Sequence, residues 1–280
     1  MLLSVNSGMH SARPDKPRYD MVRETVGFFA ENGFDALDVN FCPCIYEGDL
    51  HEPILDGEHW QQNLDELMAK CREKGMIISS THLPYRYNYL DPQEDGYAEN
   101  HAMTVRALQA SEYIGAPWAV MHFKEEVGTE QYVKKLLQDA GCSHVGIAIE
   151  NDSRFSLEAL IRTHDRLLEA GYPVGICFDI GHCHVNAWQE YDVCQVIEML
   201  GKRIKVLHLH DNKRDKDAHQ EPYSGNIPWE AAMRALKKAG YEGEFNYELI
   251  NNRVPECLRQ AYAQYYREIG RYLISVFHQA

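Results

Sequence analysis

Short apolar runs alternate with longer amphipathic stretches along the whole chain. The runs are rich in β-branched and aromatic residues, a pattern typical of buried parallel strands. They cover residues 2–5, 36–39, 76–79, 118–121, 145–149, 174–178, 204–207 and 244–247. The stretches between and after them are predicted helices, at residues 20–32, 58–74, 99–114, 129–140, 157–170, 191–200, 229–239 and 255–277.

Six of the predicted helices are followed directly by a glycine that ends them. These glycines are Gly33, Gly75, Gly115, Gly141, Gly171 and Gly240. Glycine adopts the left-handed turn of a helix C-cap at little cost, so each marks a helix–strand junction. Eight strand–helix units in 280 residues predict an α/β protein, a single (β/α)8 barrel domain over residues 1–280. The rival fold, a doubly wound open sheet, usually has a glycine-rich phosphate turn after its first strand, and residues 6–10 lack one.

Charge and composition narrow the range of partners. The chain has 28 Lys+Arg and 42 Asp+Glu, a net charge of −14, which disfavours nucleic acid and anionic membranes as partners. No apolar run approaches the roughly 20 residues that span a bilayer, and the first residues lack the basic flank of a signal peptide. The eight cysteines form no CxxC pair, as expected for reduced thiols. We therefore expect a cytoplasmic protein; association into a homo-oligomer stays open.

Polar residues close six of the predicted strands. One strand–helix unit separates each of them from the next, so all six side chains are expected at the C-terminal mouth of the barrel, where barrel active sites lie. The residues are His82, His122, Glu150, Asp179, His208 and Glu248.

Carboxylates and imidazoles that converge in a buried pocket need a compensating charge, because they otherwise lose hydration and repel one another. A divalent cation supplies that charge, and these side chains are its usual ligands. Glu150, Asp179, His208 and Glu248 form an oxygen-rich set that suits one Mn²⁺, Zn²⁺, Co²⁺ or Mg²⁺ ion. The alternative is a separate hydrogen bond from each residue to a loop. That alternative explains a single such residue well, but it explains six residues at equivalent positions poorly.

Two more groups follow strand ends. His182 comes three residues after Asp179, and Arg214 comes six residues after His208. Both residue types bind substrate oxygens, and both also occur at the surface or as supports of a metal site.

The segments around these residues resemble the xylose-isomerase-like barrel superfamily. They are Phe-Asp-Ile-Gly-His at 178–182, Val-Leu-His-Leu-His-Asp-Asn at 206–212, and Asp217-x-His219 followed by Ser-Gly-Asn-Ile-Pro-Trp at 224–229. The chain is most similar to the sugar (phosphate) isomerase and epimerase branch, whose relatives include ketose 3-epimerases, keto-glycoside epimerases and inosose dehydratases. The loop at 224–226 departs from that branch, which usually has Gly-x-Gly there.

The resemblance implies a role for each matching residue. Glu150, Asp179, His208 and Glu248 would hold a single divalent metal ion, with Glu150 and Glu248 as the acid/base pair. His182, Arg214, His82 and His122 would contact a small sugar substrate. The implied activity is isomerisation or epimerisation by proton transfer through a metal-bound enediolate.

Other functions remain open at this point. The superfamily includes three-zinc apurinic endonucleases, and this chain aligns with their nine ligands once Asp217 and His219 are added as possible further metal ligands or supports. Against that activity stand the net charge and the lack of a basic groove around Arg86, Lys124 and Arg154. A dehydratase acting on a keto-polyol and a sugar-binding barrel without turnover are further alternatives.

Overall fold

The computed structural model describes residues 1–10, 18–42, 55, 58–84, 92–93, 95–122, 128–151, 156–187, 190–250 and 254–280. Eight strands form one parallel sheet in the order β7-β6-β5-β4-β3-β2-β1-β8. They are β1 (Leu3–Asn6), β2 (Ala36–Asn40), β3 (Ile77–His82), β4 (Trp118–Met121), β5 (Gly146–Glu150), β6 (Val174–Asp179), β7 (Ile204–His208) and β8 (Phe245–Tyr247). A parallel bridge between Leu209 and Tyr247 joins the two edges and closes the sheet into a barrel.

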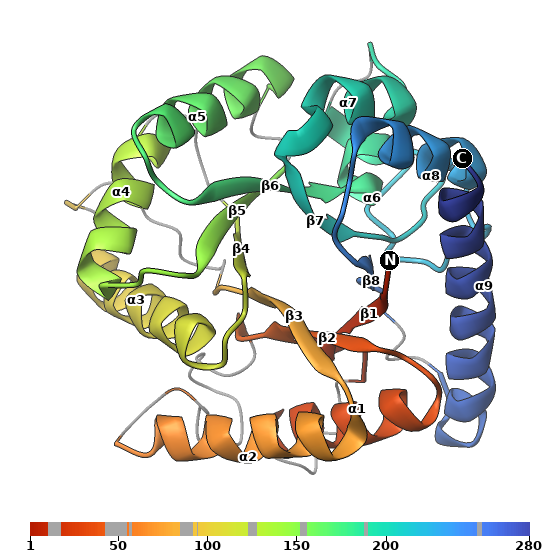
Figure 1. The fold of residues 1–280 in the computed structure, drawn as a ribbon, viewed down its shortest axis with the longest axis horizontal. Helices are drawn as coiled ribbons and strands as arrows, with labels where there is room; N and C mark the ends of the chain where they lie inside the picture. The colour runs from red at the N-terminus through yellow and green to blue at the C-terminus, as the bar shows by residue number, and fades with distance from the viewer. Residues whose placement is uncertain are drawn as a thin grey trace.

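Helices surround the barrel on the outside (Figure 1). They are α1 (Arg18–Glu31), α2 (Trp60–Lys74), α3 (Tyr97–Tyr113), α4 (Thr129–Ala140), α5 (Leu157–Glu169), α7 (Val193–Leu200), α8 (Trp229–Ala239) and α9 (Arg259–Gln279). The (β/α)8 prediction is confirmed. All six predicted C-cap glycines have positive φ angles, between 66° and 84°.

Several boundaries differ from the prediction. The final helix begins at Arg259 and not at residue 255, because the 3-10 turn η5 (Glu256–Leu258) precedes it. Among the described residues, the sequence pattern also missed four short elements: η1 (Ser7–His10), α6 (Ile180–His182), the π-helical turn η3 (Cys183–Ala187) and the 3-10 turn η4 (Gly201–Arg203). Such short turns carry no apolar period for a sequence pattern to detect.

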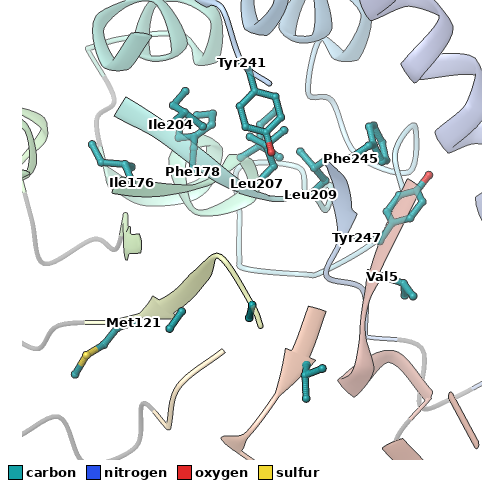
Figure 2. Close-up of a cluster of buried hydrophobic side chains, with 14 of the residues drawn as sticks. Val5, Met121, Ile176, Phe178, Ile204, Leu207, Leu209, Tyr241, Phe245 and Tyr247 are labelled. Atoms are coloured by element: carbon teal, nitrogen blue, oxygen red, sulfur yellow. The ribbon is translucent and has the colours of Figure 1, made fainter. Parts of the chain in front are cut away.

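The main hydrophobic core lies between the outer faces of the strands and the helices. Figure 2 shows part of it, where Phe178, Leu207, Phe245 and Tyr247 belong to β6, β7 and β8. Tyr241 is a buried member of the same core. Side chains of successive strand residues point to opposite faces, so every second residue faces the barrel interior.

Those interior residues form layers. A small apolar layer of Val120, Ala148, Cys177 and Val206 packs with Trp118. Gly146 makes room for the Trp118 ring, since a Cβ there would lie 2.3 Å from Cζ3 of the indole. Two residues further along the chain from these four positions, the residues are polar and lie at the C-terminal mouth. No helix in the described ranges is long and apolar enough to cross a membrane.

Candidate metal centre

The six residues predicted at strand ends do meet at the mouth of the barrel. His82, Glu150, Asp179 and His208 are the last residues of β3, β5, β6 and β7, and His122 and Glu248 directly follow β4 and β8. Their position follows from the parallel sheet, which brings all strand carboxyl ends to one side. The sequence prediction of their convergence is therefore confirmed.

Glu150 is the hub of this cluster. It is completely buried, and its Oε2 lies 2.9 Å from His122 Nε2 and 3.4 Å from His82 Nε2. Its Oε1 lies 3.3 Å from Nδ1 of both His182 and His208. Four imidazoles, from β3, β7, the residue after β4 and the short helix α6, thus surround one carboxylate.

Glu150 also belongs to a group of four potential metal ligands. Single ligand atoms of Glu150, Asp179, His208 and Glu248 all lie within 4.8 Å of one another. His208 Nδ1 is 3.2 Å from Glu248 Oε2, as well as 3.3 Å from Glu150. The predicted four-residue set is therefore assembled, with Glu248 the only member that keeps some exposure, at 18% of its side chain.

A second group lies next to the first, made of His182, His210, Asp217 and His219. Asp217 Oδ2 is 3.0 Å from His219 Nε2 and 3.4 Å from His182 Nε2. The Nδ1 atoms of these two rings donate to backbone carbonyls, of Glu248 and Asn151 respectively. Such outer hydrogen bonds fix the ring so that the opposite nitrogen faces a metal.

The donor atoms fit a divalent cation. Both carboxylate oxygens of Glu150 and both ring nitrogens of His208 are buried without a hydrogen bond of ordinary geometry, despite the short distances between them. Unpaired buried polar atoms of this kind are rare and costly. Donors on a tetrahedral zinc ion, bound at 2.0–2.2 Å, lie about 3.3 Å apart, close to the 3.2–3.3 Å separations found here.

The electrostatics of the metal-free cluster show how strongly its members interact. Burial acts to raise the pKa of Glu150, but the charges of His122 and His208 outweigh it and hold that pKa well below its usual range. Burial likewise opposes protonation of His219, yet the bond to Asp217 raises its pKa to about 9. Protonated imidazoles thus supply only part of the compensation in the metal-free cluster, since both Glu150 oxygens still lack a hydrogen bond.

The loop after β7 is organised by one buried carboxylate, Asp211. It accepts from the backbone N–H groups of Asn212, Tyr223 and Ile227 and from Trp229 Nε1. Gly225 permits this packing, because a Cβ there would lie 2.2 Å from Asn212 O and from Asp211 Oδ1. The loop in turn carries Asp217 and His219 to the mouth.

The predicted substrate residues differ in position. His82, His122 and His182 lie inside the cluster. Arg214 stays at the exposed rim, with a positive φ of 66°, and its backbone N–H donates to Asn212 Oδ1. Its guanidinium forms no ion pair with a described carboxylate, so its predicted role stays a prediction. Arg86, Lys124 and Arg154 lie outside the described residues.

Two buried residues of the site escaped the sequence prediction. His210 Nε2 lies 3.0 Å from Asp179, and Asp38 Oδ2 lies 3.6 Å from His208 Nε2. The His-x-His spacing at 208–210 and the acidic residue inside the apolar run of β2 were the available signals.

The sequence pattern of the xylose isomerase-like TIM barrel family matches residues 26–269. The chain belongs to this family. Among curated relatives, the uncharacterized protein y4fM of Sinorhizobium fredii is 31% identical over 109 residues, covering 38% of this chain and 33% of that protein. A probable endonuclease 4 of Staphylococcus carnosus is 28% identical over 195 residues, covering 60% of this chain and 65% of that protein. The family member described here therefore spans less than two thirds of either relative.

A solved structure shares the fold over the whole chain. A D-tagatose 3-epimerase-like protein superposes with a TM-score of 0.74 at 19% identity, covering 100% of this chain and 99% of the other. At that identity the match establishes the shared barrel.

Proposed function

We propose that this protein is a divalent-metal-dependent isomerase or epimerase of a sugar or sugar phosphate. The observation that carries the proposal is the pair Glu150 and Glu248, which reach His208 Nδ1 at 3.3 and 3.2 Å from β5 and from the end of β8. Two carboxylates that approach one point from different strands suit removal of a proton on one face of a carbon and its return on the other. The likeness to a D-tagatose 3-epimerase-like protein supports the same substrate class.

Glu150, Asp179, His208 and Glu248 are the proposed ligands of a catalytic ion. When bound there, a divalent ion polarises the substrate carbonyl as a Lewis acid and so acidifies the neighbouring C–H. Its oxygen-rich ligand set suits Mn²⁺, Mg²⁺, Co²⁺ or Zn²⁺.

The two glutamates have different access to a substrate. Glu248 keeps 18% of its side chain exposed at the mouth, and it is the group that takes the proton. Glu150 is fully buried, so its proton passes to and from the mouth of the barrel through His122. His122 Nε2 lies 2.9 Å from Glu150 Oε2, and the His122 side chain is 13% exposed. His182, at 18% exposure, is placed to bind a substrate oxygen.

Hydrogen exchange from substrate carbon tests this assignment. Metal-loaded protein is incubated in D₂O with a panel of ketoses, ketose phosphates and keto-glycosides, and deuterium beside the carbonyl is followed by NMR. Exchange is expected with wild type and with the control Glu198→Gln, an exposed residue paired with Lys238. Glu150→Gln and Glu248→Gln are expected to lose it; retained exchange in both variants contradicts the acid/base assignment. Loss of water from a keto-polyol would identify the dehydratase subclass.

A second candidate function, cleavage of nucleic-acid phosphodiesters with three metal ions, has specific support. All nine residues that align with the three-zinc pattern converge in the structure, including His182, Asp217 and His219 in the second group. Relatives named probable endonuclease 4 match the sequence. The net charge of −14 weakens the case, since DNA affinity depends on neutralised phosphates. Cleavage of a duplex with one abasic site by zinc-loaded protein would establish it.

A further inference from the structure

The histidines of the cluster are oriented in two different ways. His82, His182 and His219 each place Nδ1 against a backbone carbonyl, of Leu83, Asn151 and Glu248, at 2.8–3.1 Å. Their Nε2 atoms face the carboxylates of the cluster. His208 is reversed. Its Nδ1 faces Glu150 and Glu248, and its Nε2 points back into the barrel without any backbone partner.

The group that faces His208 Nε2 is the carboxylate of Asp38, at 3.6 Å. Asp38 lies on β2, one layer below the cluster, and both side chains are completely buried. The two residues are far apart in sequence and meet only because the barrel closes. No sequence motif contains both.

Asp38 is held in place by three neutral donors from three other strands. Asn6 Nδ2 donates to Oδ2 at 2.7 Å and Ser80 Oγ donates to Oδ1 at 2.9 Å. Asn246 Nδ2 lies 3.4 Å from Oδ2. All three are buried. A carboxylate enclosed by donors is fixed as an acceptor, yet neutral donors alone compensate a buried charge incompletely.

We propose that Asp38 is a positioning residue of the metal centre. With an ion on Nδ1, the Asp38 carboxylate, now 3.6 Å from His208 Nε2, would accept a hydrogen bond from the Nε2–H, which fixes the ring tautomer and makes Nδ1 a stronger ligand. Asp38 is not one of the proposed ligands of the ion. The inference rests on the proposed metal-dependent function, because it concerns a ligand of that ion.

The test is the dissociation constant of Co²⁺ and its visible absorption spectrum, measured without substrate on the full chain. Asp38→Asn keeps the size of the side chain and removes the charge, so it is expected to weaken Co²⁺ binding about 10- to 100-fold and to shift the absorption bands. The control is Ser79→Ala, a buried hydroxyl on β3 that contacts Ser4 and the Leu37 carbonyl but not Asp38. It should bind within about threefold of wild type. An Asp38→Asn variant that matches wild type in both affinity and spectrum overturns the proposal.

A measurement on wild type keeps the proposal testable if Asp38→Asn does not fold. In ¹⁵N-histidine NMR spectra of the zinc-loaded protein, His208 is expected to carry its proton on Nε2 and the ion on Nδ1. The opposite tautomer overturns the role of Asp38. If wild type binds no divalent ion, the proposed metal-dependent function is wrong. If wild type binds the ion and Asp38→Asn binds it equally well, only the role of Asp38 is wrong.

Discussion

His122 Nε2 lies 2.9 Å from Oε2 of Glu150, yet neither oxygen of that fully buried carboxylate has a hydrogen bond of ordinary geometry. The barrel strands hold the imidazole nitrogen and the carboxylate oxygen close together, but the two atoms do not form a well-oriented hydrogen bond. A buried carboxylate in this condition is costly. A divalent ion between the donors removes the cost.

Metal binding should therefore stabilise the fold through Glu150. A ligand that binds only the native state at 100 times its dissociation constant adds about 2.7 kcal/mol to the free energy of unfolding. We expect Mn²⁺ or Zn²⁺ to raise the thermal midpoint of wild type and of Glu198→Gln, whose glutamate is exposed. Glu150→Gln should lose that rise, because it removes the central anionic ligand. An equal rise in Glu150→Gln would show that the ion binds elsewhere.

The loop that carries Asp217 and His219 should depend on Asp211. Replacing Asp211 with Ala leaves the N–H donors of Tyr223, Ile227 and Trp229 without their acceptor. The expected loss in free energy of unfolding is about 3 kcal/mol or more by urea denaturation, with faster proteolysis between residues 212 and 228. Asp215→Ala, an exposed position in the same loop, should change stability by less than about 0.5 kcal/mol. Comparable losses in both variants would refute this role of Asp211.

Close packing of Gly181 against His210 should make the site sensitive to a single methyl group. A Cβ at position 181 would lie 1.8 Å from His210 Cε1, so the imidazole must move away from Asp179. Gly181→Ala should lose about 1–3 kcal/mol of stability. Gly27→Ala in α1 is the matched control. Its nearest atom would be Lys70 Cε at 3.9 Å, and replacing a helical glycine with alanine adds about 0.5–1 kcal/mol. A Gly181→Ala variant as stable as wild type would contradict the packing.

A partly exposed ion pair away from the site gives a pH-dependent prediction. Asp165 binds Arg203 through two hydrogen bonds, which lower the pKa of the carboxyl to about 2. Because that pKa lies below its unfolded value, the pair stabilises the native state above about pH 4 and loses its effect as the pH falls toward 2. Asp165→Asn should cost about 1 kcal/mol near neutral pH, since solvent screens the pair. Urea denaturation at about pH 7, 5 and 3 measures the difference in free energy of unfolding between Asp165→Asn and wild type. A difference that grows as the pH falls would contradict the prediction.

The sequence predicted the barrel because apolar residues recur with different periods in strands and in helices. Buried strands, amphipathic helices and the six glycine C-caps recur in order, and the parallel topology then places His82, Glu150, Asp179 and His208 at one mouth. The contact of Asp38 with His208 could not be predicted, since it joins β2 and β7, which are distant in sequence. His210 was missed although it lies two residues after a predicted ligand. The turns around His182 depend on local hydrogen bonds such as His182 N–H to Asp179 Oδ1, which leave no periodic trace. The acid/base roles of Glu150 and Glu248 stay proposals.

The metal content of each chain tests the central claim, that the mouth of the barrel holds a catalytic divalent ion. Protein purified without chelator or metal-affinity resin is analysed by mass spectrometry, before and after dialysis against Mn²⁺, Co²⁺ or Zn²⁺. We expect about one tightly bound ion per chain at the site of Glu150, Asp179, His208 and Glu248. About three zinc ions would instead favour the phosphodiesterase. Protein that contains no divalent ion and takes up none on dialysis would contradict the account.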